Sequence, residues 1–77
     1  MKEIYELFDE FDTEVIPVSD FRIITNGVLV DCIILNPQTN NSIKIWAGNP
    51  YEDKYAEELV LNKEERKRIL EEIIENF

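Results

Sequence analysis

The dipeptide Asn26-Gly27 stands between two apolar runs, at residues 21–25 and 28–35. A two-residue type I′ turn needs positive φ at both central residues, and Asn-Gly meets that need better than other pairs. The sequence therefore predicts an antiparallel hairpin with a fixed register. The expected partners are Thr25 with Val28, Ile23 with Val30, Arg22 with Asp31 and Phe21 with Cys32. The opposite charges of Arg22 and Asp31 support this register.

Two helices are expected to flank the strands. Apolar residues at Ile4, Leu7, Phe8 and Phe11 follow the i, i+3, i+4, i+7 spacing of an amphipathic helix from residue 1 to about residue 11. Near the other end, Asn62 stands three residues before Glu65, a helix-capping pattern. The helix that it opens carries apolar residues at Ile69, Leu70, Ile73, Ile74 and Phe77.

The remaining segments are short. Residues 15–18 contain Pro17 and suit an extended connector or a short edge strand. Residues 36–41 predict a polar turn, and residues 42–47 a third strand. Asn49-Pro50 with Glu52 resembles a helix start, and Tyr51, Tyr55 and Leu59 recur at helical spacing. A short helix to about residue 58 is one interpretation, and a strand at residues 59–61 is the other.

We therefore expect one α+β domain spanning residues 1–77, in the order α-β-β-β-(α)-α. It has an N-terminal helix, a three-stranded antiparallel sheet, and one short and one long C-terminal helix. A chain of 77 residues is near the lower size limit for a single apolar core. Cys32 is the one cysteine, which favours a buried, reduced thiol and a cytoplasmic protein. No apolar run approaches the roughly 20 residues of a membrane span.

The predicted hairpin gives the sheet two apolar faces. The face expected to form the core carries Phe21, Ile23, Val30, Cys32, Ile34, Ile43 and Ile45. The other carries Ile24, Leu29, Ile33, Leu35 and Trp46, with Arg22, Asp31 and Lys44 among them. Because a solvated outer face is mostly polar, we expect a helix, a second copy or a partner to cover this one. The residues proposed for self-association are Ile24, Leu29, Ile33 and Trp46, which would give a homodimer.

The residue types needed for most catalysis are missing. The chain has no histidine, one cysteine and two glycines, which excludes a catalytic triad, a Cys-based zinc site and a glycine-rich phosphate loop. We expect no enzyme activity, no catalytic residue, no cofactor and no metal.

Charge gives the strongest indication of a partner. The net charge is −9, with a pI near 4.3. Such a charge repels nucleic acids and anionic membranes but attracts basic proteins. Seven carboxylates and one lysine in residues 1–20 give that segment −6. The expected partner-binding residues are Glu3, Glu6, Asp9, Glu10, Asp12, Glu14 and Asp20, with Glu52, Asp53, Glu57 and Glu58 as a second patch.

The two helices distribute their charges differently. In the last helix, Glu64–Arg68, Lys67–Glu71 and Arg68–Glu72 are i, i+4 pairs of opposite sign, typical of a solvated face. The first helix has no cation after Lys2. Carboxylates one helical turn apart are separated by about 5–6 Å, a spacing comparable with successive phosphates of a nucleic-acid strand. We therefore expect the first helix to mimic DNA toward a basic surface.

In length, pI, acidic first helix and helix-then-three-strands layout, the chain resembles small acidic phage-encoded DNA-mimic inhibitors. The layout is also similar to that of acidic anti-CRISPR proteins. The resemblance implies action in the host cytoplasm on a DNA-binding protein. The histone-like nucleoid protein HU is the favoured target, and RNA polymerase, a uracil-DNA glycosylase or a Cas nuclease are others. The alternative is an interaction or immunity-type module that binds through the apolar outer sheet face.

Overall fold

The computed structural model describes residues 3–36 and 42–77 and confirms the α+β class. Of the turn predicted at residues 36–41, residues 37–41 lie outside the described residues. The elements in chain order are α1 (Ile4–Phe11), β1 (Val15–Pro17), a 3₁₀ turn (Ser19–Phe21), β2 (Ile24–Thr25), β3 (Val28–Leu29), β4 (Cys32–Leu35), β5 (Ile43–Ala47), β6 (Glu57–Glu58) and α2 (Lys63–Asn76). No helix in this part of the chain is both long and apolar enough to cross a bilayer.

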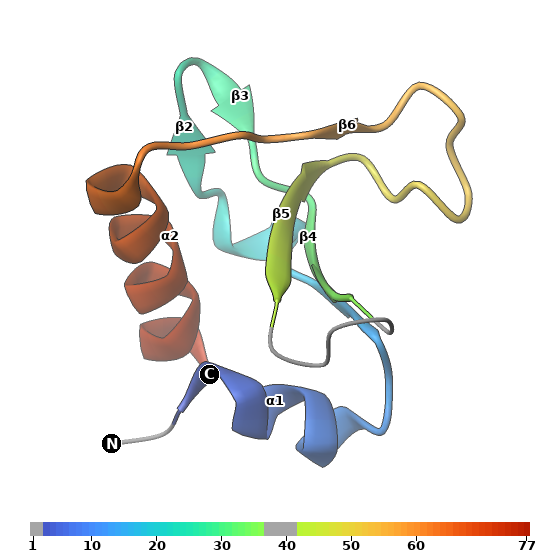
Figure 1. Ribbon diagram of the computed structural model, residues 1–77, viewed down its shortest axis with the longest axis vertical. Coiled ribbons are helices and arrows are strands. Elements are labelled where there is room, and N and C mark those ends of the chain that lie inside the picture. The colour runs from blue at the N-terminus through green and yellow to red at the C-terminus, as the bar shows by residue number, and fades with distance from the viewer. Residues whose placement is uncertain (1–2, 37–41) are drawn as a thin grey trace.

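The strands form two antiparallel units. One is a four-stranded sheet in the order β1-β4-β5-β6, and the other is the β2-β3 hairpin. In the larger sheet, Ile33 pairs with Ile16 on one side and with Ile45 on the other, and all three side chains are buried. This face packs in one apolar core with Leu7 of α1 and Ile69 of α2. Figure 1 shows α2 beside the sheet and α1 near its lower end.

The hairpin prediction is correct near the turn and wrong farther away. Thr25 pairs with Val28, and the Val30 N–H donates to the Ile23 carbonyl at 2.9 Å. Beyond Ile23 the strands separate, because residues 19–21 form a 3₁₀ turn that ends at Arg22 with φ of 56°. The expected pairs Arg22–Asp31 and Phe21–Cys32 therefore do not form. Instead, Cys32 pairs with Pro17 of β1.

A β-bulge separates β3 from β4. Trp46 pairs with Cys32 in the sheet register, and its carbonyl also accepts the Asp31 N–H at 2.9 Å. Asp31 and Cys32 thus both stand across from Trp46 of β5. An extra residue in one strand reverses which side chains face the core beyond it. This explains why Val30 and Ile33, three residues apart, are both fully buried.

The bulge corrects the predicted sheet faces. The prediction placed Ile43 and Ile45 on the face of Cys32 and Ile34, as if the strand from residue 28 to 35 were uninterrupted. In the structure Ile45 pairs with Ile33 and Ile43 with Leu35, so these four share the core face. Cys32 and Ile34 lie on the other face, together with their cross-strand partners Trp46 and Lys44. No helix of the described residues covers that face in Figure 1.

The segment after β5 forms turns rather than the short helix. The Asn49 side chain accepts the Tyr51 N–H, and the Asp53 side chain accepts the Tyr55 N–H, each at 2.9 Å. Such local side-chain bonds compete with helical backbone bonds. Tyr51 and Tyr55 are 65% and 78% exposed, so no packing favours a helix. The alternative, a strand at residues 59–61, is also wrong, because the strand of this segment is β6 at Glu57–Glu58.

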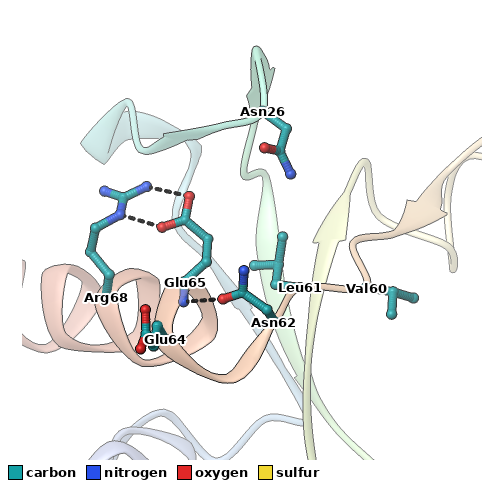
Figure 2. Close-up of a pocket in the computed structure, with 7 residues that line it drawn as sticks. All are labelled: Asn26, Val60, Leu61, Asn62, Glu64, Glu65 and Arg68. Atoms are coloured by element: carbon teal, nitrogen blue, oxygen red, sulfur yellow. Dashed lines mark hydrogen bonds and ion pairs between the residues drawn. The ribbon is translucent and has the colours of Figure 1, made fainter.

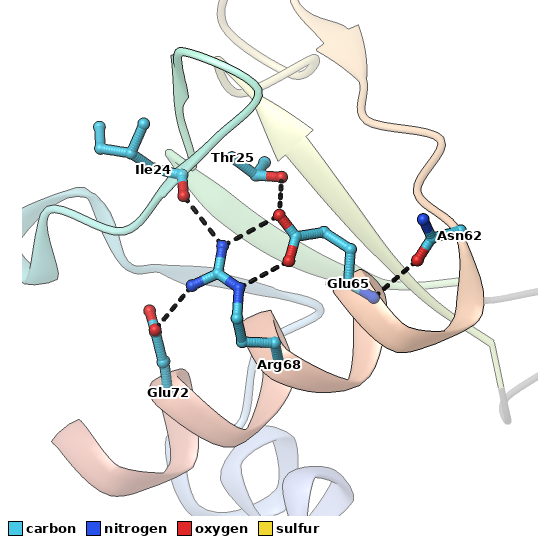
Figure 3. A network of polar contacts seen from close by, with 6 residues as sticks. All are labelled: Ile24, Thr25, Asn62, Glu65, Arg68 and Glu72. Carbon is cyan, nitrogen blue, oxygen red and sulfur yellow. Dashed lines mark hydrogen bonds and ion pairs between the residues drawn. The ribbon is translucent and has the colours of Figure 1, made fainter.

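The capping prediction for the last helix is confirmed. The Asn62 side chain accepts the Glu65 N–H at 2.8 Å, and α2 begins at the next residue. Figure 3 shows how α2 is fastened to the hairpin. Thr25 donates to the Glu65 carboxylate at 2.8 Å, and Arg68 donates to the Ile24 carbonyl at 3.1 Å. Two residues of one helical turn thus hold strand β2 of the hairpin.

Candidate interaction surface

The acidic side of α1 faces solvent. Ile4, Leu7 and Phe8 are buried in the core, whereas Glu3, Glu6, Asp9 and Glu10 are exposed. At about 100° per residue, these four acids fall within roughly one third of the helix circumference, opposite the buried stripe. The structure therefore brings them together as an acidic face.

Two further acids, Asp12 and Glu14, continue that face around the C-terminal end of α1. Asp12 ends the helix in the left-handed conformation, and its N–H donates to the Asp9 carbonyl at 3.3 Å. Asp9, Asp12 and Glu14 line one hollow, together with Phe8, Thr13 and Leu35. The C-terminal end of a helix is itself electronegative. Negative potential is thus concentrated here. We call Glu3, Glu6, Asp9, Glu10, Asp12 and Glu14 the acidic ridge.

Three of the four cations of α2 have partners outside the ridge. Arg68 forms ion pairs with Glu65 and Glu72 at 2.6 and 2.7 Å, and Lys67 approaches Glu71 at 4.0 Å. Arg66 donates to the Ile43 carbonyl. Within residues 3–36 and 42–77, no lysine or arginine forms an ion pair with Glu3, Glu6, Asp9, Asp12 or Glu14.

The other predicted acids lie elsewhere. Asp20 is in the 3₁₀ turn and lines a hollow with Arg22, Ile24 and Leu29. Glu52 and Asp53 belong to the loop after β5, which Figure 1 shows at the opposite end of the molecule from α1. Glu57 and Glu58 form β6, and Glu58 is paired with Lys44 at 3.1 Å. The second patch is therefore separate from the ridge and partly neutralised.

The residues expected to mediate self-association do not form one surface. Ile33 is fully buried in the core. Ile24 and Leu29 pair across the hairpin and remain 51% and 36% exposed. Trp46 lies in β5, opposite Cys32, and its indole N–H is buried without an acceptor among the described residues. Only the Ile24–Leu29 pair remains an exposed apolar surface of the predicted kind.

The β1 edge of the sheet is closed to a further strand. The Val18 N–H donates to the Asp31 carbonyl, and the Leu35 N–H donates to the Glu14 carbonyl, so residues 14 and 18 bond to β4. Because hydrogen bonding alternates along an antiparallel strand, the backbone N–H and carbonyl of Val15 point away from β4, toward the free edge. The Thr13 hydroxyl occupies both outward groups, accepting from the Val15 N–H at 3.2 Å and donating to its carbonyl at 3.1 Å. Pro17, the next outward residue, has no N–H to offer.

A hollow at the start of α2 is lined by one arginine, Arg68, and two glutamates, Glu64 and Glu65. Figure 2 shows Asn26, Val60 and Leu61 around it, with Glu65 held by Arg68 in its wall. The arginine and Thr25 hydrogen bonds lower the pKa of Glu65 to about 2. Glu65 in turn raises the pKa of Arg68. Glu65 and Arg68 are thus paired with each other, and Glu64 leaves the hollow with one negative charge, compared with three carboxylates in the hollow at the end of α1.

One surface feature was missed by the sequence reasoning. Phe11 and Phe77 were both assigned to helix core stripes, yet they are 50% and 41% exposed. They lie at the ends of α1 and α2 and line a pocket that shares Thr13 with the acidic hollow. Helical periodicity places them on the apolar sides of their helices, but it gives no information on whether another element covers those ends.

The described residues offer little for catalysis or metal binding. They contain no group of three His, Cys, Asp or Glu side chains suited to a metal ion. Cys32 is buried, and burial, followed by the nearby carboxylates of Asp31 and Glu52, raises its thiol pKa to about 11. Since the thiolate is the reactive form, this cysteine is a weak nucleophile.

No protein-family model, curated protein or solved structure matches this chain.

Proposed function

We propose that this domain is a non-catalytic binding protein whose acidic ridge occupies the basic DNA-binding surface of a partner and blocks DNA binding. In the manner of phage-encoded DNA mimics, it would act in the host cytoplasm. The separation of charges between the two helices carries the proposal. Arg66, Lys67 and Arg68 of α2 are held by acids of their own helix and by the Ile43 carbonyl. Five acids of the ridge form no ion pair with a lysine or arginine of the described residues: Glu3, Glu6, Asp9, Asp12 and Glu14.

The ridge suits this role because most of its acids project from a helix that is anchored in the core. A backbone already ordered before binding loses little conformational entropy on binding. Complementary charges also accelerate association and make affinity depend on salt. The nucleoid protein HU is the first partner to test, because its DNA-binding surface is basic and small enough to match one compact domain.

The test is displacement of a fluorescent DNA duplex from purified HU. The wild-type protein should release the duplex, and the effect should weaken steeply between about 50 and 200 mM salt. The variant Glu6→Lys/Asp9→Lys/Glu10→Lys should lose the effect. The matched control Glu64→Lys/Glu71→Lys/Glu75→Lys changes total charge equally, but on α2. Equal loss of duplex release in both variants would show that net charge, and not the ridge, causes the release.

Failure of the wild-type protein to release DNA from HU would remove HU as the target. Capture experiments with RNA polymerase, a uracil-DNA glycosylase and a Cas nuclease, each challenged with competing DNA, would then test the wider proposal. Binding to none of these basic proteins would reject it.

A second candidate function rests on the hairpin. Ile24 and Leu29 form an exposed cross-strand pair beside Arg22, and this apolar surface suits a protein-interaction module. Binding through it would be insensitive to salt and lost in Leu29→Asp. The same substitution would leave ridge-dependent binding unchanged, so one variant separates the two functions.

A further inference from the structure

Three aromatic rings meet where the two helices end. Phe77 follows α2, and its ring lies 5.4 Å from that of Phe11 and 5.1 Å from that of Phe21, centre to centre. The ring planes are inclined by 62° and 85°, the edge-to-face arrangement that aromatic pairs favour. Phe77 therefore has a defined position, although it lies outside the helix.

This aromatic group borders a small apolar pocket. The pocket has a volume of about 220 Å³ and is lined by Phe11, Thr13, Ile16, Pro17 and Phe77. It is smaller than the pockets that hold drug-sized ligands, roughly 300–1,000 Å³, and its size suits a single side chain. Aromatic residues left exposed beside such a pocket are typical anchor points of protein interfaces.

The pocket adjoins the acidic hollow at the end of α1. Thr13 lines both, with Asp9, Asp12 and Glu14 on one side and the phenylalanines on the other. The apolar pocket and the acidic hollow therefore share Thr13 as a wall, and the three carboxylates form no ion pair with a described cation. A ligand filling both must carry an apolar group next to positive charge.

We propose that the Phe11–Phe77 pocket receives an apolar side chain of the basic partner, while lysine or arginine residues flanking it face Asp9, Asp12 and Glu14. The inference rests on the proposed function and specifies the partner segment. Charge complementarity selects this occupant over a second copy of the chain, because a second copy would bring its own acidic ridge against the first. Nucleic acid has no apolar group next to positive charge. Occupation of the pocket would therefore show that the domain recognises features specific to a protein, in addition to mimicking DNA.

Two synthetic twelve-residue peptides of equal charge test the inference. Both carry four arginines, and they differ only in having leucine or serine between the central two. The leucine peptide should bind the wild-type protein about tenfold more tightly. This difference should persist when added salt weakens both peptides. Binding should shift the amide NMR signals of Thr13 and Ile16 but not that of Tyr55.

Phe77→Ser should remove the preference for leucine and leave serine-peptide binding unchanged. Tyr55→Ser, at an exposed ring distant from the pocket, is the control and should keep the preference. If Phe77→Ser disturbs the fold, the shifts of the Thr13 and Ile16 amide signals in the wild-type protein still show whether the leucine peptide binds at the pocket. Equal affinities of the two peptides for the wild-type protein, or shifts elsewhere, would overturn the inference but leave the ridge proposal intact. Failure of both peptides to bind at low salt would overturn both.

Discussion

Arg68 holds both carboxylate oxygens of Glu65, through Nε at 2.6 Å and Nη2 at 3.0 Å. The same guanidinium reaches the Ile24 carbonyl, and Thr25 donates to the same carboxylate. This network is the main polar link between α2 and the hairpin in Figure 3. It also pairs the charge of Arg68 with those of Glu65 and Glu72 at the surface of α2.

The network predicts acid sensitivity. Folding lowers the pKa of Glu65 from its ordinary value of 4.5 to about 2, chiefly through the hydrogen bond from Arg68. The ionised carboxylate therefore stabilises the folded state above about pH 4.5, and this contribution is lost as pH falls from 4.5 toward 2. In Glu65→Gln, the thermal midpoint should be lower at pH 7 and should fall less over that interval.

Thermal unfolding followed by circular dichroism between pH 7 and 2 measures this effect. Glu64→Gln, an exposed neighbour outside the network, removes the same charge and should keep the wild-type profile. Parallel profiles for wild-type and Glu65→Gln would show that the network does not contribute to folding.

A second prediction tests the position of the bulge. The sequence alone placed Ile24 and Ile33 on one sheet face, whereas the structure leaves Ile24 51% exposed and buries Ile33 completely. Ile33→Ala should therefore lower the free energy of unfolding by about 2–5 kcal/mol. Ile24→Ala should change it by no more than about 0.5 kcal/mol. Urea denaturation of both variants gives the comparison, and similar losses would place the two residues in equivalent surroundings.

Local signals in the sequence were sufficient for much of the fold. The Asn26-Gly27 turn, the Asn62 cap and the stripe of Ile4, Leu7 and Phe8 each depend on neighbours within four residues. The structure bears out all three. The position of the acids on the solvent side of α1 follows from the same periodicity, so the outline of the candidate site was also predictable.

The remaining features depend on contacts between distant residues. The bulge arises because Trp46 of β5 accepts from Asp31 while pairing with Cys32, and no pattern within one strand indicates this. The Phe11–Phe77 pocket likewise joins opposite ends of the described chain. The short helix predicted after Asn49 was wrong for another reason. Asn and Asp side chains accept backbone N–H groups both when they cap a helix and when they close a turn, so the sequence pattern fits either structure.

Gly48 should tolerate substitution worse than Gly27. Both adopt positive φ, 85° and 77°, so alanine at either site costs about 1–2 kcal/mol in backbone strain. At Gly48 the new Cβ would also lie 3.1 Å from the Ala56 Cβ and 3.2 Å from its Cα, whereas nothing lies within 4 Å at Gly27. Gly48→Ala should therefore lose at least about 1 kcal/mol more. Equal losses of unfolding free energy in urea denaturation would mean that the loop around Ala56 moves away from the new Cβ at little cost.

Cys32 should resist thiol reagents until the protein unfolds. Its side chain is buried, and its pKa is raised to about 11, first by burial and then by the carboxylates of Asp31 and Glu52. At pH 8 only about one thiol in a thousand is then ionised. Alkylation by iodoacetamide should be far slower in the native state than in urea, and its rate should keep rising above pH 9. Glu52→Gln should raise the native rate modestly, whereas Glu57→Gln should leave it unchanged. A native rate that levels off near pH 9 would show that Cys32 is accessible and unperturbed.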